Sequence, residues 1–152
     1  MLILDQVRDP GNLGTLLRTA LAGGMTGVVC MKGTVDPWSP KVVRATMSAA
    51  FKLPLVVDVE PEALRPLLQR SSLPLYFLVP GTPKVYFDVI YPDAYGIVVG
   101  NENKGISPAL KACHGEEISI PLIGPIESLN AGVAGGIVIY EALRQKVLRD
   151  AQ

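Results

Sequence analysis

Short runs of consecutive hydrophobic residues alternate along this chain with longer stretches in which hydrophobic residues recur at helical spacing. Six of the runs are rich in Val, Ile and Leu and have the length of strands: MLILD (1–5), TGVVCM (26–31), LPLVVDV (53–59), LPLYFLV (73–79), YGIVVG (95–100) and EEISIP (116–121). Because these runs are continuous rather than alternating, we expect both faces of the strands to be buried. The order of strands and helices predicts an α/β fold with a mostly parallel sheet between helix layers.

The helical stretches begin and end at recognisable signals. The first has a hydrophobic stripe with the i, i+3, i+4, i+7, i+8 spacing of a helix face, formed by Leu13, Leu16, Leu17, Ala20 and Leu21. Gly23 and Gly24 are expected to end this helix. Ser-Pro pairs predict the N-cap and first position of two further helices, over residues 41–50 and 109–115.

Two later helices contain residues that are unusual inside a helix. Pro61 is predicted to open a helix over residues 62–70, which Pro66 is expected to break or kink. The last helix is predicted from about Ser128 to Arg149. Its glycines allow another element to approach the backbone closely, and we expect that neighbour to be a second subunit. These glycines are Gly132, Gly135 and Gly136.

The composition is typical of one well-buried globular domain. With 152 residues and 49% hydrophobic content, the chain is long enough for one core and short for two. Fourteen Lys and Arg residues balance fourteen Asp and Glu residues, so a strong attraction of the whole molecule to nucleic acid is not predicted, although a local patch is not excluded. The most hydrophobic stretch, residues 131–143, is too short for a membrane span and contains Glu141. Because the first residues already have a strand pattern, we expect no targeting segment before the fold.

Few residues indicate metal, redox or nucleophilic chemistry. Cys30 and Cys113 are far apart and His114 is the only histidine, so we expect buried thiols and no metal site. His114 is expected to cap the end of its short helix rather than act as a base. Trp38 is expected to be a partly exposed loop residue. The chain lacks the glycine and serine patterns of nicotinamide enzymes, P-loop ATPases and common hydrolases, which excludes those classes in their usual form.

Three stretches contain polar residues that a core does not require. In RDPGNLGTLLRTALAGG (8–24), Gly11 and Gly14 allow tight backbone geometry where the free N–H groups of a helix start can hold an anion. A phosphate or ribose bound there would also meet the Asn12 amide and the Arg18 guanidinium. A plain helix cap with a solvated arginine explains the same stretch equally well.

The other two stretches follow predicted strands. A strand ends at Gly100 and is followed by four polar residues, Asn101, Glu102, Asn103 and Lys104. Ligands of open α/β sheets bind beyond the carboxyl ends of strands, although a turn in which Glu102 caps backbone amides is the alternative. In IPLIGPIESLNAGVAGG (120–136), Glu127, Ser128 and Asn130 cluster at the start of the glycine-rich helix. The alternative there is a simple N-cap formed by Ser128.

Taken in this order, the three stretches resemble the three motifs of the SpoU branch of the SPOUT RNA methyltransferases. RDPGNLGTLLRTALAGG is similar to the first motif, and IVVGNENKGIS is similar to the second with its N-E-x-x-G core. ISIPLIGPIESLNAGVAGGIVIYEALRQ is similar to the third, which contains S-L-N. The similarity extends from Leu4 to Gln145, and three ordered motifs are far more specific than any one of them.

The resemblance implies a fold and a reaction that the residue pattern alone does not give. Members of this family have an α/β domain whose C-terminal part forms a deep trefoil knot, an exception to the rule that chains avoid knots. They bind S-adenosylmethionine within the knot, work as homodimers in which the partner subunit completes each site, and methylate a ribose 2′-hydroxyl. We therefore expect residues 1–152 to form one catalytic domain acting on ribosomal RNA. Transfer RNA is the nearest alternative substrate, and a non-catalytic module that binds RNA or S-adenosylmethionine is another alternative.

The functional positions of the family match individual residues of this chain. The resemblance implies that the methyl donor is contacted by Gly81, Gly100, Asn101, Ile120, Pro121, Leu122 and Leu129. It implies catalytic positions around the reacting ribose at Asn12, Arg18, Glu102, Ser128 and Asn130. Arg18 is the first catalytic candidate, but a guanidinium is a poor base because it holds its proton strongly. It is therefore expected to activate the hydroxyl, to stabilise the forming alkoxide or to grip the adjacent phosphate.

Three further expectations concern the setting of this domain. Relatives with this style of first motif usually have an N-terminal RNA-binding domain, which is absent from this chain, so the domain alone is expected to bind RNA poorly. A bulky side chain at Gly100 is expected to weaken donor binding. The resemblance implies a protein of the bacterial cytoplasm or, within a longer eukaryotic precursor, of an organelle matrix, with no membrane and no metal involved.

Overall fold

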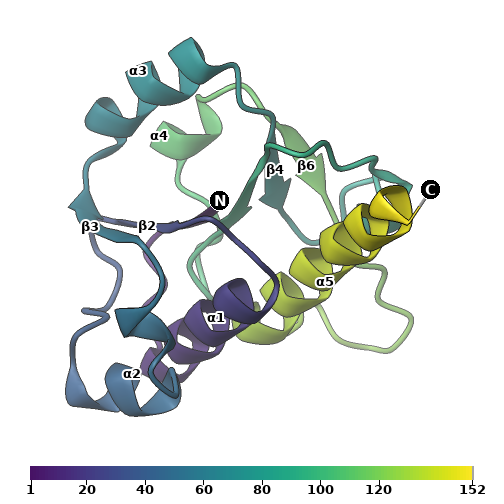
Figure 1. Cartoon of the computed structure of the whole chain (residues 1–152). Coiled ribbons are helices and arrows are strands. Elements are labelled where there is room, and N and C mark those ends of the chain that lie inside the picture. Colours follow the sequence, from purple (N-terminus) through teal and green to yellow (C-terminus); the bar gives the residue numbers. More distant parts are fainter. Residues whose placement is uncertain (152) are drawn as a thin grey trace.

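The computed structural model describes residues 1–151 as a six-stranded sheet with helices on both faces (Figure 1). The strands are β1 (Leu2–Leu4), β2 (Val28–Met31), β3 (Leu55–Val59), β4 (Leu75–Leu78), β5 (Gly96–Val99) and β6 (Glu116–Ile118). The helices are α1 (Pro10–Ala22), α2 (Pro40–Ala45), α3 (Pro61–Ser71), α4 (Pro108–Lys111) and α5 (Ala131–Asp150), with 3-10 turns η1 (Ala49–Phe51) and η2 (Tyr86–Asp88). All six predicted strands are confirmed.

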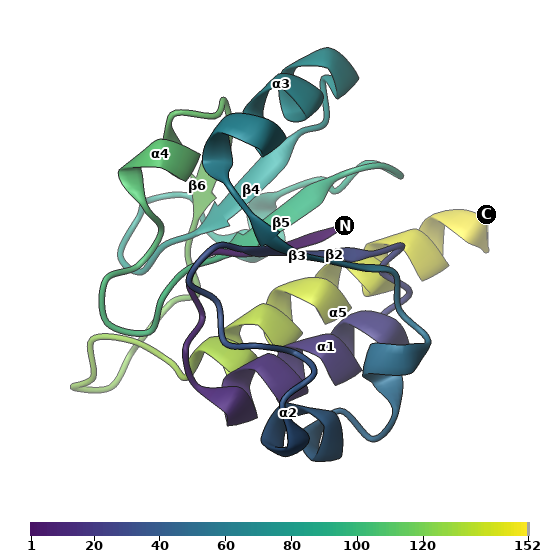
Figure 2. The ribbon, with the colours of Figure 1, turned by 90° about the vertical axis from the view of Figure 1, so that its left-hand side faces the viewer.

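Every neighbouring pair of strands is parallel, in the order β3-β2-β1-β5-β4-β6. Figure 2 shows α1, α2 and α5 below the sheet and α3 and α4 above it. Both hydrophobic faces of the central strands are covered in this way, and β1, β2 and β5 are buried throughout. The α/β class and the parallel sheet between helix layers are therefore confirmed, whereas the trefoil knot stays a prediction.

The expectation that both faces of each strand are buried is wrong for the edge strand β3. Val56 and Val57 in its middle are exposed, because an edge strand has a neighbour on one side only. Asp58 has a left-handed φ of 55°, and the pairing with β2 shifts register between Val29 and Met31. A bulge of this kind twists the edge and interrupts its pairing surface.

Helix α2 is shorter than the predicted helix over residues 41–50. It ends at Ala45, and Met47 and Ser48 both adopt left-handed backbone angles, with φ of 49° and 69°. Consecutive left-handed residues cannot continue a right-handed helix, so the chain turns back into η1. Pro40 occupies the first turn as predicted, but the Ser39 side chain makes no capping hydrogen bond.

The other helix expectations have mixed outcomes. Helix α3 continues through Pro66, because Leu64 and Leu68 on either side are buried and hold the helix against the sheet. His114 is not a helix cap: α4 ends at Lys111, and Ala112 is its C-cap residue. Both cysteines are buried free thiols, as expected.

Helix α5 begins at Ala131, three residues later than Ser128. Asn130 is its N-cap, and the Asn130 side chain accepts hydrogen bonds from the backbone N–H groups of Gly132 and Val133. A Cβ at Gly135 would lie 2.4 Å from Cδ2 of Leu16 in α1. The close neighbour of the glycine face is therefore α1 of the same chain, and the expectation that this neighbour is a second subunit is wrong.

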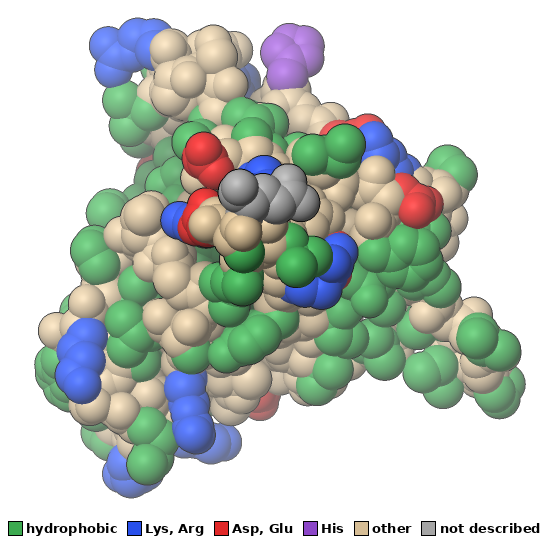
Figure 3. Space-filling model, turned by 45° about the vertical axis from the view of Figure 1, so that its right-hand side comes forward, with side chains coloured by type: hydrophobic (Ala, Val, Ile, Leu, Met, Phe, Trp, Pro, Cys, Tyr) green, Lys and Arg blue, Asp and Glu red, His purple; other side chains and the backbone are tan. Residues whose placement is uncertain are grey.

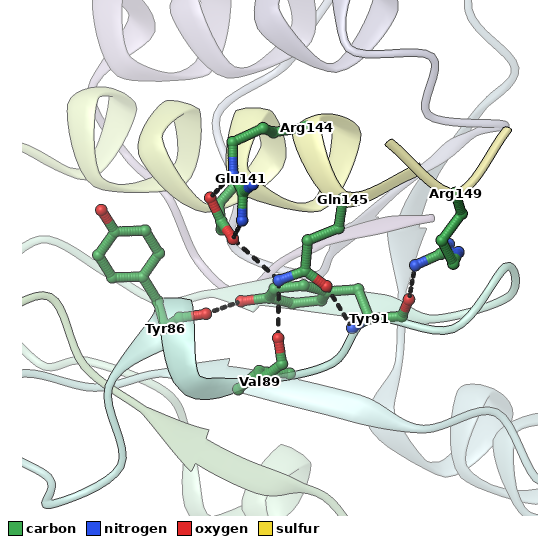
Figure 4. A network of polar contacts seen from close by, with 7 residues as sticks. All are labelled: Tyr86, Val89, Tyr91, Glu141, Arg144, Gln145 and Arg149. Carbon is green, nitrogen blue, oxygen red and sulfur yellow. Dashed lines mark hydrogen bonds and ion pairs between the residues drawn. The ribbon is translucent and has the colours of Figure 1, made fainter. Parts of the chain in front are cut away.

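The C-terminal half of α5 is fastened to the segment around η2 (Figure 4). Gln145 accepts a hydrogen bond from the backbone N–H of Tyr91 and donates to the carbonyl of Val89. Arg149 donates to the carbonyl of Tyr91, whose hydroxyl donates to the carbonyl of Tyr86. Burial raises the pKa of the Tyr91 phenol, which stays a neutral donor. These bonds fix where α5 lies over the sheet.

Candidate functional site

A cavity of about 800 Å³ opens at the carboxyl ends of β4, β5 and β6. We call the hydrophobic residues of its lining the hydrophobic wall: Leu78, Val79, Val99, Ile120, Leu122, Leu129, Ala131 and Ala134. The polar residues of the lining are Asn12, Asn101, Glu102, Asn103, Lys104, Glu127, Ser128 and Asn130. Pro80, Gly100 and Gly105 complete the lining. The second and third candidate stretches meet here with one residue of the first.

The loop from residue 100 to residue 107 is a tight, internally bonded turn. The backbones of Asn101 and Gly105 exchange two hydrogen bonds of 2.9 and 3.0 Å, and Gly105 has a left-handed φ of 69°. The Asn101 side chain accepts from the backbone N–H groups of Asn103 and Lys104 and donates to the carbonyl of Gln6. A Cβ on Gly100 would lie 2.4 Å from the backbone carbon of Gly105. A side chain at position 100 therefore disrupts this turn before it reaches any ligand, so weakened donor binding would be an indirect effect.

Glu102 binds the loop between β1 and α1. Its carboxylate accepts hydrogen bonds from the backbone N–H groups of Arg8 and Asp9 and from the side-chain amide of Asn12, at 3.0 to 3.2 Å. Partial burial raises the pKa of the Glu102 carboxyl, but these hydrogen bonds outweigh it and hold the pKa below its ordinary value. Glu102 is therefore a carboxylate that joins two segments of the site.

The same chain of contacts continues to α5. Asn12 is buried, with 7% of its surface exposed, and its side-chain oxygen accepts a hydrogen bond of 2.7 Å from Asn130. The first helix turn is already capped, because Asp9 accepts from the backbone N–H of Asn12. The Asn12 N–H is therefore not free for a phosphate or ribose, as the sequence had suggested for the start of this helix. The network of Glu102, Asn12 and Asn130 ties all three candidate stretches together.

Sequence reasoning missed Asp5. This carboxylate is only 2% exposed and accepts a hydrogen bond of 2.6 Å from the backbone N–H of Ser107, at the start of α4. The available signal was a charged residue directly after a fully hydrophobic strand, since such a residue is almost never buried without a partner. Asp5 holds the far end of the 100–107 loop, as Glu102 holds its middle.

Three backbone donors on the cavity wall have no partner within residues 1–151. The N–H groups of Ile120, Leu122 and Leu129 make none of the hydrogen bonds that the structure contains in that range. Free N–H groups beside hydrophobic side chains suit a flat, polar-edged ring such as adenine, which needs an apolar slot and in-plane hydrogen bonds. The cavity therefore has the chemistry that an adenosyl group requires.

Not every predicted site residue lines this cavity. Gly100, Asn101, Ile120, Leu122 and Leu129 do so from the expected donor set. Pro121 and Gly81 do not, and Pro80 lies in the lining in place of Gly81. Leu78, the last residue of β4, and Val79, the residue after it, were missed, although the carboxyl end of YFLVP is the signal that points to them.

Arg18 also lies outside the lining of the cavity in its own chain. It is exposed on α1 and forms no ion pair within residues 1–151. In the same described part of the chain, no three His, Cys, Asp or Glu side chains are grouped as metal ligands would be, and no helix has the length and hydropathy of a bilayer span.

Comparison with known proteins decides the family. The model of the SpoU rRNA Methylase family matches residues 1–140. This chain belongs to that family. The SpoU domain is 34% identical over 140 residues to the 23S rRNA (guanosine(2553)-2′-O)-methyltransferase RlmP of Bacillus subtilis, and the match covers 92% of this chain and 56% of RlmP.

Solved structures agree with the SpoU assignment. The SpoU methyltransferase AviRb from Streptomyces viridochromogenes, in complex with the cofactor AdoMet, matches with a TM-score of 0.90 and 29% identity over 97% of this chain and 60% of AviRb. A structure described as giving insight into 2-OH methylation of C/U34 on tRNA matches with a TM-score of 0.85 and 25% identity, over 97% of this SpoU domain and 96% of that chain. The chain spans about half the length of the curated relatives it matches.

Proposed function

We propose that this SpoU domain transfers a methyl group from S-adenosylmethionine to a ribose 2′-hydroxyl of ribosomal RNA. The observation that carries the proposal is the cavity at the strand ends, with its hydrophobic wall and the unbonded N–H groups of Ile120, Leu122 and Leu129. The names of RlmP and of the AviRb complex support the reaction and the donor. Ribosomal RNA as substrate places the protein in the bacterial cytoplasm or in an organelle matrix.

The reaction needs alignment and charge stabilisation more than a strong base. Bound S-adenosylmethionine supplies a methyl group on a sulfonium ion. The bond from sulfur to carbon breaks as the bond from the ribose oxygen to carbon forms, and the hydroxyl proton leaves to solvent. Holding the hydroxyl in line with the methyl group supplies a large part of the acceleration. Arg18 stabilises the forming alkoxide, because its guanidinium is a charged donor at neutral pH.

In this proposal, Arg18 of one subunit reaches the cavity of the other subunit across a dimer interface. Several large hydrophobic side chains are left exposed, including Val133, Tyr140 and Val147, which recur every seven residues on one face of α5. Ile123 is fully exposed at 102%, on the projecting loop from residue 121 to residue 130 beside the cavity, visible at the lower right of Figure 3. Exposed hydrophobic surface of this extent marks an interface. We propose that a second copy covers it and brings Arg18 to the neighbouring cavity.

Transfer RNA is the second candidate substrate. The structure described for methylation of C/U34 on tRNA is covered over 96% of its length, whereas RlmP is covered over 56%. A chain of this size can therefore resemble a whole protein of that kind. The sequence identity is lower, 25% against 34%, and ribosomal RNA remains the first proposal.

Calorimetric titration with S-adenosylmethionine, followed by transfer of a labelled methyl group to bulk ribosomal and transfer RNA, tests the proposal. We expect one donor site per chain and label in ribosomal RNA. Label found only in transfer RNA would make transfer RNA the substrate in place of ribosomal RNA. Donor binding without transfer to either RNA would support a non-catalytic module. No donor binding would contradict the assignment of the cavity. The Arg18→Ala variant is expected to lose transfer while its donor affinity changes by less than a few-fold, since Arg18 does not line the cavity.

A further inference from the structure

A hydrophobic and basic surface lies at the end of the molecule formed by α2 and η1. We define the α2 surface by the exposed side chains of Trp38, Lys41, Arg44, Phe51 and Lys52. Figure 3 shows Lys and Arg side chains gathered at the lower left, where Figure 1 places α2, with hydrophobic side chains between them. None of the site geometry described above uses this surface.

The backbone places two aromatic rings together in solvent. The Asp36 side chain accepts from the backbone N–H of Trp38, which fixes the turn before α2. The left-handed pair Met47 and Ser48 then reverses the chain and returns Phe51 to the Trp38 ring, with ring centroids 6.0 Å apart. Trp38 is 47% exposed and Phe51 is 68% exposed. Left-handed non-glycine residues are costly and gather at functional positions, and two aromatic rings open to solvent are suited to stacking on a base.

Basic side chains outnumber acidic ones around these rings. Residues 36–57 contain three basic residues and one acidic residue, Asp36, whose side chain is bonded to the backbone N–H of Trp38, in a chain whose total charge is zero. None of the three, Lys41, Arg44 and Lys52, forms an ion pair within residues 1–151, whereas Lys32, Lys84 and Lys111 elsewhere are each paired with a Glu. Unpaired cations between exposed aromatic rings match a single-stranded nucleic acid, which offers phosphates and base faces together.

The α2 surface adjoins Arg18. A Cβ on Gly14 would lie 2.3 Å from Cβ of Ala45, so α2 packs directly on this face of α1. Arg18 is one helical turn beyond Gly14 and lies on the same side of α1. Nucleotides that flank a ribose held at Arg18 therefore have a basic, aromatic path to follow across α2.

We propose that the α2 surface binds single-stranded RNA next to the target nucleotide, with a base stacked on Trp38 and Phe51 and phosphates on Lys41, Arg44 and Lys52. The identity of this RNA as the methylation substrate rests on the proposed function above. The surface gives a chain of zero net charge a local means of holding RNA.

Trp38 reports on this contact directly, because it is the only tryptophan of the chain. Titration with an unlabelled single-stranded RNA of ten nucleotides is expected to quench Trp38 fluorescence up to a saturating level, since a base stacks on the ring. Polyphosphate, which has charge but no bases, is expected to bind without that quenching. Equal quenching by polyphosphate, or none by RNA, would overturn the stacking contact. An emission change on dilution of the protein without RNA would instead show that a second copy covers these rings.

Substitutions test whether RNA binding depends on the α2 surface or on cations elsewhere in the protein. Trp38→Ala is expected to weaken RNA binding at least about 5-fold, the low end for loss of one stacked base. Lys41→Ala with Arg44→Ala is expected to weaken RNA binding and to reduce the slope of log affinity against log salt by about 1.4, or about 0.7 per cation. The charge control removes two exposed cations on the opposite face of the sheet, Arg70→Ala with Lys111→Ala, of which Lys111 is paired with Glu117, and is expected to leave both values unchanged. Equal effects of the two double variants would contradict a local surface.

Donor binding distinguishes failure of this inference from failure of the proposed function. If wild-type protein binds S-adenosylmethionine and methylates RNA, but the Trp38 and Lys41/Arg44 variants methylate it with unchanged KM, the α2 surface is not an RNA site. If no donor binds, but RNA still quenches Trp38 and the variants weaken RNA binding, the α2 surface is supported as an RNA site. The proposal of methyl transfer is then contradicted.

Discussion

Glu102 joins the second stretch of the site to the first. Its carboxylate holds Arg8, Asp9 and Asn12 on the other side of the cavity rim. Glu102→Gln is expected to lower the free energy of unfolding at pH 7 by about 1 kcal/mol, which is below the usual contribution of a hydrogen bond to a charged group because solvent partly screens this carboxylate. Urea unfolding measures the loss.

The pH dependence of that loss has a defined sign. The pKa of Glu102 is lowered in the folded state, so its contribution is fully present above the unfolded-state pKa of about 4.3 and disappears as pH falls through the lower folded value. The difference in unfolding free energy between wild type and Glu102→Gln is therefore expected to be present near neutral pH and to vanish in acid. Glu127→Gln, at an exposed position outside any helix and without a hydrogen bond or ion pair within residues 1–151, is the control and is expected to show no such difference. A constant difference from pH 7 to pH 3 would contradict the role of the charge.

At single positions, the sequence located the polar residues of the site but not the hydrogen bonds among them. The polar positions Asn12, Glu102 and Asn130 were found from the sequence, but as candidates for contact with a ribose. In the fold they are occupied with one another, because their partners come from segments about 90 or more positions away in sequence. Hydrogen-bond partners over such separations depend on the crossing of loops, which local spacing does not encode. Asp5 was missed for the same reason.

At the scale of elements, small residues set how α1 meets its neighbours. A methyl group on Gly14 would lie 2.3 Å from Cβ of Ala45, whose position the backbone fixes, whereas one on Gly136 would meet Cγ2 of Thr19 at an ordinary 3.6 Å. Gly14→Ala is expected to lower stability by about 1 to 2 kcal/mol, because the steric conflict exceeds the gain in helix propensity. Gly136→Ala is expected to raise stability by up to about 1 kcal/mol.

A double variant tests whether the contact itself causes this effect. Adding Ala45→Gly to Gly14→Ala removes the opposing methyl group. The double variant is therefore expected to be less destabilised than the sum of the two single variants, by most of the loss that Gly14→Ala causes alone. Denaturant midpoints of the four proteins give the coupling. Strict additivity of the two changes would mean that Gly14 acts through the backbone and not through α2.

The elements themselves were predicted where one signal dominated. Hydrophobic runs located all six strands, and Pro40, Pro61 and Pro108 located three helix starts. The end of α2 was not predicted, because Met47 and Ser48 adopt left-handed angles that their residue types disfavour. The start of α5 was placed three residues early, at Ser128 instead of Ala131, since Ser128 and Asn130 are equally good N-caps and only the fold selects Asn130.

At the scale of the whole molecule, the cavity and Arg18 belong to different surfaces of one chain. Arg18 is absent from the cavity lining, while hydrophobic side chains beside the cavity and along α5 are exposed. A two-fold dimer places the same patch of each copy against the other, so an arginine outside one cavity can serve the second. Complementation between two inactive variants decides whether it does.

One variant is Arg18→Ala and the other is Ala134→Leu, which keeps the helix but fills the hydrophobic wall of the cavity. Each is expected to be inactive alone. In a mixed dimer, the Ala134→Leu chain supplies an intact Arg18 to the intact cavity of the Arg18→Ala chain. Random mixing of equal amounts is therefore expected to restore about a quarter of wild-type methyl transfer, since half of the dimers are mixed and each has one complete site. If Arg18 serves its own chain, every site in every dimer carries a defect and the mixture stays inactive. Light scattering on the same sample checks that dimers form, and a monomer with activity would contradict the shared site outright.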